Sequence, residues 1–81
     1  MARTLTLRKT GPSQFVETVE TEGYPLVTKR RYSTWENVDE RLRQVGLETE
    51  EILRLKSAFD SGADTALIRL PYRPGDAINT I

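Results

Sequence analysis

The chain has no cysteine and no histidine among its 81 residues. Without cysteine it has no disulfide framework, no thiolate metal site and no redox-active thiol. Without histidine it lacks the commonest general base and the commonest metal ligand. The glycine-rich phosphate-binding patterns GxxxxGKS/T and GxGxxG are also missing. We therefore predict a protein that is not an enzyme, with no catalytic residue, no cofactor and no bound metal.

The chain also lacks a long apolar run and an excess of charge of either sign. No segment reaches the roughly 18 apolar residues of a membrane span. Residues 1–5 show no apolar leader and are typical of the start of a strand. Twelve basic residues balance twelve acidic ones, which argues against a strong field around the whole molecule. We expect a cytoplasmic protein without membrane contact.

The composition that remains is that of a small folded domain. Hydrophobic residues make up 37% and charged residues 30% of the chain, which is ordinary for a globular protein. A chain of this length buries roughly 60–65% of its unfolded surface, which allows a modest core but not a deep cavity as well. We predict one domain over residues 1–71, followed by a C-terminal tail over residues 72–81.

Residues 33–62 have the most regular apolar spacing and predict two helices joined by a tight corner. Ser33 and Glu36 fit a capping box at the start of the first helix. Gly46 supplies the left-handed residue that a helix favours just past its end. The apolar stripe of this helix, at a period of 3.6 residues, consists of Trp35, Val38, Leu42 and Val45.

The second helix is predicted to begin at Thr49 or Glu48 and to end at residues 60–62. Acidic residues in its first turn suit the positive end of the helix dipole. If Glu48 is the cap, Leu47 and Ile52 are placed to form a hydrophobic staple. The inward stripe consists of Ile52, Leu55 and Phe59.

Other segments are predicted as strands, at residues 3–10, 14–21, 26–32 and 65–70. Leu5 and Leu7 alternate with polar residues, as in a half-buried strand. In the second strand Phe15, Glu17 and Val19 share one face, but the imperfect alternation leaves open which face is core. The last strand is the most continuously apolar run of the chain, which predicts a strand inside the sheet and covered on both faces.

The third strand divides into two sides. One side holds Leu26, Thr28, Arg30 and Tyr32, and the other holds Val27, Lys29 and Arg31. Glu17 and Glu20 of the second strand are expected to face Lys29 or Arg31 across the ladder.

The predicted fold class is α+β in the order β-β-β-α-α-β. A small, mostly antiparallel four-stranded sheet carries the helical hairpin on one face. We expect the helical stripes to pack on Leu5, Leu7 and either Leu67 or Ile68.

The two helices and their corner resemble a helix-turn-helix. In that family a corner glycine is followed by an apolar residue, and an aliphatic residue comes a turn and a half later. The matching residues are Gly46, Leu47, Ile52 and Leu55. The resemblance implies a second helix that reads DNA. The chain departs from the pattern at Leu42, where a small residue is usual. It also departs at residues 48–51, whose acidic side chains would be repelled by phosphates.

Basic residues in the first half of the chain offer a different nucleic-acid contact, a basic strand face. Its candidate residues are Arg8, Lys9, Lys29 and Arg31. Because successive residues of a strand point to opposite faces, Arg30 and Arg31 cannot both join that face. The competing interpretation is a charged edge strand that resists edge-to-edge pairing.

The two parts of the chain differ in charge. Residues 1–33 carry six basic side chains against three acidic ones, and residues 34–62 carry four against seven. The simplest interpretation is that the two parts complement each other within one fold.

The predicted tail carries the remaining candidates for partner contact, Tyr72, Ile78 and Ile81. An apolar tail has reason to dock, and the most available surface is a second copy of the chain. We predict a non-catalytic protein–protein interaction module or accessory subunit whose partner is another protein or, in a homodimer, itself. The alternative is a nucleic-acid-binding protein that uses the basic strand face.

Overall fold

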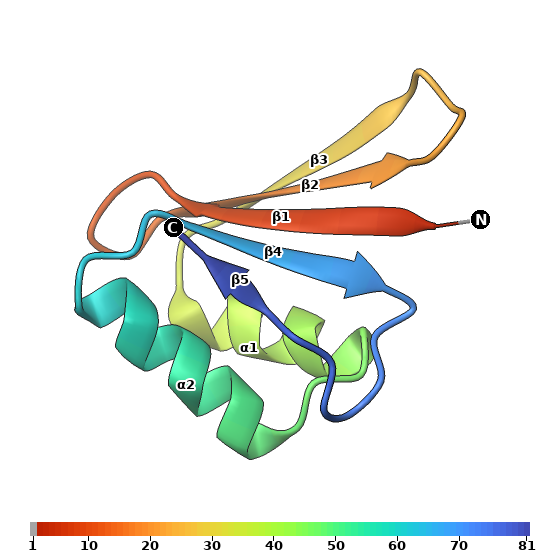
Figure 1. Cartoon of the computed structure of the whole chain (residues 1–81). Helices are drawn as coiled ribbons and strands as arrows, with labels where there is room; N and C mark the ends of the chain where they lie inside the picture. The colour runs from red at the N-terminus through yellow and green to blue at the C-terminus, as the bar shows by residue number, and fades with distance from the viewer. Residues whose placement is uncertain (1) are drawn as a thin grey trace.

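The computed structural model describes residues 2–81 as one antiparallel sheet with two helices on one side (Figure 1). In chain order, the elements are β1 (Arg3–Lys9), β2 (Phe15–Thr21), β3 (Val27–Tyr32), α1 (Trp35–Gln44), α2 (Thr49–Asp60), β4 (Thr65–Leu70) and β5 (Asn79–Thr80). The strands lie in the order β3-β2-β1-β4-β5. The predicted α+β class and helix pair are confirmed. The predicted count of four strands is wrong, because β5 adds a fifth.

Side-chain alternation divides the sheet into a face toward the helices and a face turned away from them. On β1, Leu5 and Leu7 are buried on the helix side, and the register places Val19 and Glu17 of β2 directly beside them. The core face of β2 is therefore the one with Phe15, Glu17 and Val19. A buried carboxylate in the middle of this face is what obscured the alternation in the sequence.

β4 lies inside the sheet, between β1 and β5, as predicted. The expectation that it is covered on both faces is wrong. Ala66 and Ile68 are fully buried on the helix side, but Leu67 is only half-buried on the other face. The register sets Leu67 between Thr6 and Asn79, on the side of the sheet where Figure 1 shows no helix.

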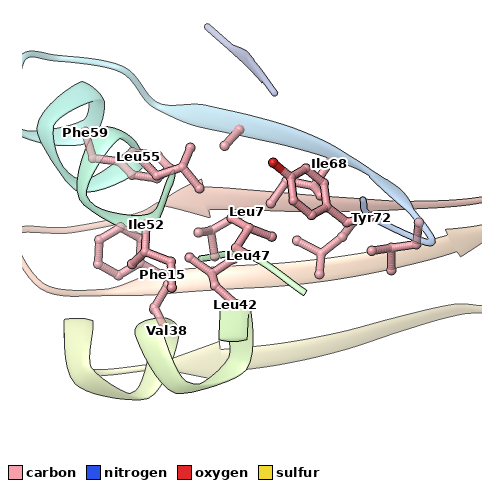
Figure 2. Packing of buried hydrophobic residues seen from close by; sticks show 13 residues of the cluster. Leu7, Phe15, Val38, Leu42, Leu47, Ile52, Leu55, Phe59, Ile68 and Tyr72 are labelled. Atoms are coloured by element: carbon pink, nitrogen blue, oxygen red, sulfur yellow. The ribbon is translucent and has the colours of Figure 1, made fainter. Parts of the chain in front are cut away.

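The core lies between the sheet and the helices (Figure 2). Its buried hydrophobic residues are Leu5, Leu7, Phe15, Val38, Leu42, Leu47, Ile52, Leu55, Phe59, Ala66, Ile68, Leu70 and Tyr72. Burying each of the larger side chains contributes about 1.5–3 kcal/mol. At one margin Trp35 packs edge-on against Phe15 and Phe59, with ring centroids 5.4 Å and 6.2 Å apart. Both predicted helical stripes thus face the sheet.

The corner between the helices is built on Gly46, as predicted. Gly46 has φ +111° and donates to the carbonyl of Arg43 at 3.2 Å, while Leu47 donates to the carbonyl of Leu42 at 3.0 Å. These two bonds form a Schellman motif, which requires the left-handed residue that glycine adopts without strain.

The helix starts differ from the prediction at one of the two positions. The N-cap of α1 is Thr34, whose hydroxyl accepts from the backbone N–H of Asn37 at 3.3 Å, and not Ser33. The cap of α2 is Glu48, whose backbone N–H donates to the Glu51 carboxylate at 3.0 Å.

The segment after β4 returns to the sheet. Tyr72 is buried against the core and β5 pairs with β4. The backbone of Ile81 accepts from Asp64 at 2.7 Å and donates to Thr65 at 2.8 Å. Residues 72–81, predicted as a separate tail, are thus held by the domain's own core and its own edge.

Candidate functional site

The sheet face turned away from the helices is uncovered in the structure (Figure 1). We call it the open face. From the strand registers, its side chains are Thr4, Thr6 and Arg8 of β1, Val16, Thr18 and Glu20 of β2, Val27, Lys29 and Arg31 of β3, Thr65, Leu67 and Arg69 of β4, and Asn79 of β5. Threonines and long basic side chains dominate it, so this face is polar and solvated and is not an uncovered apolar surface.

The basic residues of the open face lie close together at one end of it. Val16 of β2 stands between Arg31 of β3 and Arg8 of β1, its direct partners across the ladder. Neighbouring strands lie about 4.8 Å apart, so the Cα atoms of the two arginines are about 10 Å from each other. Lys29 follows one row further along, opposite Thr18. All three basic side chains are exposed.

Acidic charge is scarce on this face. Its carboxylates lie toward the other end. Glu20 is opposite Val27 and Thr4, and Glu22 lines a depression with Glu20, Thr4 and Arg69, away from the Arg8–Arg31 row. Arg69 of β4 is also opposite Thr4. The prediction that Glu17 and Glu20 face Lys29 or Arg31 across the ladder is wrong, because Glu17 lies on the helix side opposite Arg30 and Glu20 lies opposite Val27.

The candidate residues of the predicted basic face are only partly brought together. Arg8, Lys29 and Arg31 share the open face, as the alternation of strands requires. Lys9 does not join them, because its register partner is the core residue Phe15 and its side chain belongs to the helix side. Arg30 is on the helix side as well.

Charge separates between the two layers of the molecule. The helix layer holds the acid-rich residues 34–62, and the open face holds Arg8, Lys29, Arg31 and Arg69 against Glu20 and Glu22. Among the described residues, the ion pair that crosses between layers joins Arg41 of α1 to Glu17 of β2. The two charges therefore stay mostly on opposite sides rather than neutralising each other, and the field of the molecule is directional.

A groove of about 550 Å³ borders the basic end of the open face. Lys29 and Arg31 form one side of it, and Thr10, Gln14 and Ser33 add polar groups from the adjoining loops. Sequence reasoning missed these three residues. Nothing in their local pattern distinguishes them from ordinary turn residues, and only the pairing of β2 with β3 places them beside the cations.

A hydrogen-bonded cluster surrounds Glu17 on the helix side. Its Oε1 accepts from the Tyr32 hydroxyl at 3.1 Å and from Nε of Arg41 at 3.0 Å. Burial of Tyr32, and then the neighbouring Glu17 carboxylate, raise the pKa of the Tyr32 phenol above its usual value. The cluster holds a charged group in the core without leaving it unpartnered, which is the condition for its stability.

The tail candidates are distributed differently from the prediction. Tyr72 is a core residue whose hydroxyl lies 3.5 Å from the carbonyl of Asp76, and Ile78 is half-buried against the core. Ile81 is exposed. Tyr24, Leu26 and Val27 are exposed as well, and they lie in the turn before β3 and at its start.

Comparisons of the chain with protein-family models, with curated proteins and with solved structures gave no match. Neither helix in residues 2–81 is long and apolar enough to cross a membrane. Within the same residues, carboxylates form no group of three or more that could hold a metal ion.

Proposed function

We propose that the chain is a non-catalytic protein that binds the phosphate backbone of nucleic acid through its open face. The observation that carries this proposal is the placement of Arg8, Lys29 and Arg31 at one end of an uncovered face whose carboxylates, Glu20 and Glu22, lie toward the other end. Phosphate contacts supply most of the affinity of proteins that do not select a sequence.

The side chains between the cations indicate the kind of contact. Val16, Thr18 and Thr6 are short, so a strand of nucleic acid can lie against the sheet while its phosphates meet the longer Arg and Lys side chains. The open face has no aromatic residue among those that the structure describes, and base stacking therefore adds nothing to binding there. We expect weak, sequence-independent binding that salt suppresses.

Fluorescence anisotropy with a labelled single-stranded RNA, and with a duplex of equal length, tests the proposal at low salt. Neutralising about three phosphates of a single strand gives a slope of log K against log salt near −2. We expect the variant Arg8→Gln/Lys29→Gln/Arg31→Gln to bind at least about tenfold more weakly than the unmodified chain.

The matched control is Arg54→Gln/Lys56→Gln/Arg73→Gln. It removes the same charge from exposed positions outside the open face. An effect of net charge alone would weaken both variants equally and would contradict the proposal, as would the absence of binding at low salt. Loss confined to the open-face variant supports it.

A second candidate is a homodimer formed through the edge strand β3. β3 is paired on one side only, with β2, and next to its start Leu26 is 80% exposed and Val27 50% exposed. Unpaired edge strands add to other strands, and antiparallel addition of an identical strand is self-complementary. A register centred on Thr28 sets Lys29 beside the second copy's Val27 and Arg30 beside its Leu26, so the cations avoid one another.

Light scattering distinguishes one chain from two. At tens of micromolar we expect twice the mass of a single chain for the unmodified protein and a monomer for Leu26→Ser/Val27→Thr. Leu53→Ser is the control, because Leu53 is similarly exposed but lies on α2. A monomeric unmodified chain removes this candidate without affecting the open face.

A further inference from the structure

A depression of about 380 Å³ lies between β3 and α1, at the edge of the sheet. One wall is the stripe Asn37, Glu40, Arg41 and Gln44, which repeats every three to four residues along α1. The other wall is the end of β3, with Arg30 on the helix side of the strand. This depression lies across the edge strand β3 from the open face, and Arg31 is the residue that borders both.

Arg41 is the lining residue that a contact with the core holds in place. Its Nε donates to the buried carboxylate of Glu17, and the side chain is 27% exposed. A guanidinium has five N–H donors in a fixed fork, so the terminal nitrogens remain for a ligand once Nε is engaged. Tyr32 donates to the same carboxylate oxygen and fixes it from the other side.

Around this anchored guanidinium the lining offers the donors that a phosphate group requires. Arg30 and Arg31 add positive charge from β3, and the amides of Asn37 and Gln44 add neutral donors from α1. Glu40 is the carboxylate that the lining includes. Arginine suits phosphate because its fork donates two parallel bonds to two oxygens.

We propose that the depression between β3 and α1 binds a dianionic phosphate group, with Arg30 and Arg41 as its principal ligands. The group is either a free phosphate or the terminal phosphate of a nucleic-acid strand. The site goes beyond the function proposed above, because its principal ligands Arg30 and Arg41 do not lie on the open face, although Arg31 borders both.

Titration of the ¹⁵N-labelled full chain with inorganic phosphate, at constant ionic strength against chloride, tests the site. We expect saturable shifts in the side-chain resonances of Arg30, Arg41, Asn37 and Gln44. Arg30→Gln removes a charged donor from an exposed position and should weaken phosphate binding by about tenfold. Lys56→Gln, which removes one exposed charge from α2, should leave it unchanged.

Glu40→Gln gives the sharper result, because a loss of stability cannot imitate it. Removing the carboxylate from the lining should tighten phosphate binding by about threefold. Glu36→Gln removes an exposed carboxylate from the same helix outside the lining and should change nothing. Shifts that grow without saturating, or equal effects of each variant and its control, would overturn the proposal.

Two oligonucleotides separate the sources of the phosphate. A single strand with a 5′-phosphate and the same strand without it are compared for binding to the unmodified chain and to Arg30→Gln. A preference for the phosphorylated strand that Arg30→Gln abolishes assigns the site to strand ends. Equal binding of both strands, together with saturable inorganic phosphate, assigns it to a free phosphate. Failure of both strands to bind would overturn the open-face proposal. The phosphate site would then be supported by saturable shifts with inorganic phosphate and overturned by their absence.

Discussion

Arg41 of α1 donates from Nε to Oε1 of Glu17 of β2 at 3.0 Å, and this is the ion pair that joins the two layers in residues 2–81. The Glu17 side chain is 3% exposed, so its charge is almost fully withdrawn from water. It is stable there because Arg41 and the Tyr32 hydroxyl both donate to it. The contact therefore fixes α1 over β2 and β3 at a defined position.

We predict that Arg41→Ala lowers the free energy of unfolding by about 2–4 kcal/mol. The variant leaves the Glu17 carboxylate buried with the Tyr32 hydroxyl as its remaining side-chain donor, and an uncompensated buried charge is strongly destabilising. Urea denaturation followed by tryptophan fluorescence measures the change, because Trp35 packs near the start of the same helix.

The control for this prediction is the pair Glu17→Gln and Glu17→Gln/Arg41→Ala. If the buried charge is the cause, the double variant should recover about 1–3 kcal/mol relative to Arg41→Ala alone. Simple additivity of the two changes would show that Arg41 acts through packing and not through Glu17.

Tyr32 should make stability depend on pH in the alkaline range. Burial and the Glu17 carboxylate raise the pKa of Tyr32 above the usual value of 10.0, so the folded protein holds the phenol proton more tightly than the unfolded chain does. The stabilisation is complete below pH 10 and is lost as pH rises through the raised pKa. Chemical denaturation from pH 8 to 12, compared with Tyr32→Phe, measures it.

Tyr32→Phe removes the titrating group and should flatten this part of the profile, after an initial loss of about 1 kcal/mol for the missing hydrogen bond. Lysine deprotonation affects both proteins alike and cancels in the comparison. Identical alkaline profiles for the two proteins would contradict the coupling of Tyr32 to Glu17.

Most of the fold could be predicted from local sequence signals. The Schellman corner at Gly46 and the inward stripes of both helices follow from residues within a few positions of one another. The exceptions depended on distant contacts. The core face of β2 could not be identified, because the partners of Glu17 come from β3 and α1. β5 was missed because residues 72–81 have no periodicity, and their order arises from pairing with β4.

The candidate site was predictable in part for the same reason. Strand alternation correctly separated Arg30 from Arg31, but Lys9 was grouped with Arg8 although adjacent residues on a strand oppose each other. The sequence also could not indicate which face the helices cover, and so whether Arg8, Lys29 and Arg31 are free. Nor could the sequence indicate that α1 lies beside β3, where the two elements form the depression around Arg41.

Gly46 should be more sensitive to substitution than Gly62. Both have φ +111°, so alanine at either position carries a similar backbone strain of about 1 kcal/mol or more. At Gly46 a Cβ would also lie 3.2 Å from the backbone oxygen of Tyr72, whereas at Gly62 it meets nothing within 4 Å. Gly46→Ala should therefore lower the unfolding free energy by more than Gly62→Ala, as measured by urea denaturation. Equal losses would mean that the backbone at Tyr72 moves away from the added Cβ with no cost in free energy.

Tyr72 should be a determinant of stability although it lies in the segment predicted as a tail. It is 7% exposed, belongs to the core cluster and approaches the helix corner at Gly46. Replacing a large buried aromatic by alanine costs about 3–5 kcal/mol through lost burial and the cavity left behind, so Tyr72→Ala should lower the thermal midpoint markedly. Ile81→Ala is the comparison, since Ile81 is 74% exposed and such positions usually change stability by less than about 0.5 kcal/mol.

Calorimetry of both variants, at equal protein concentration and at a tenfold dilution, separates docking within one chain from docking on a second copy. If residues 72–81 close the core of their own domain, the loss in Tyr72→Ala is the same at both concentrations, because no association is involved. A loss that shrinks on dilution would mean that Tyr72 stabilises contacts between chains instead. The cost of a cavity within one chain does not depend on protein concentration. A constant loss therefore indicates docking within one chain, and a loss that changes on dilution indicates docking on a second copy.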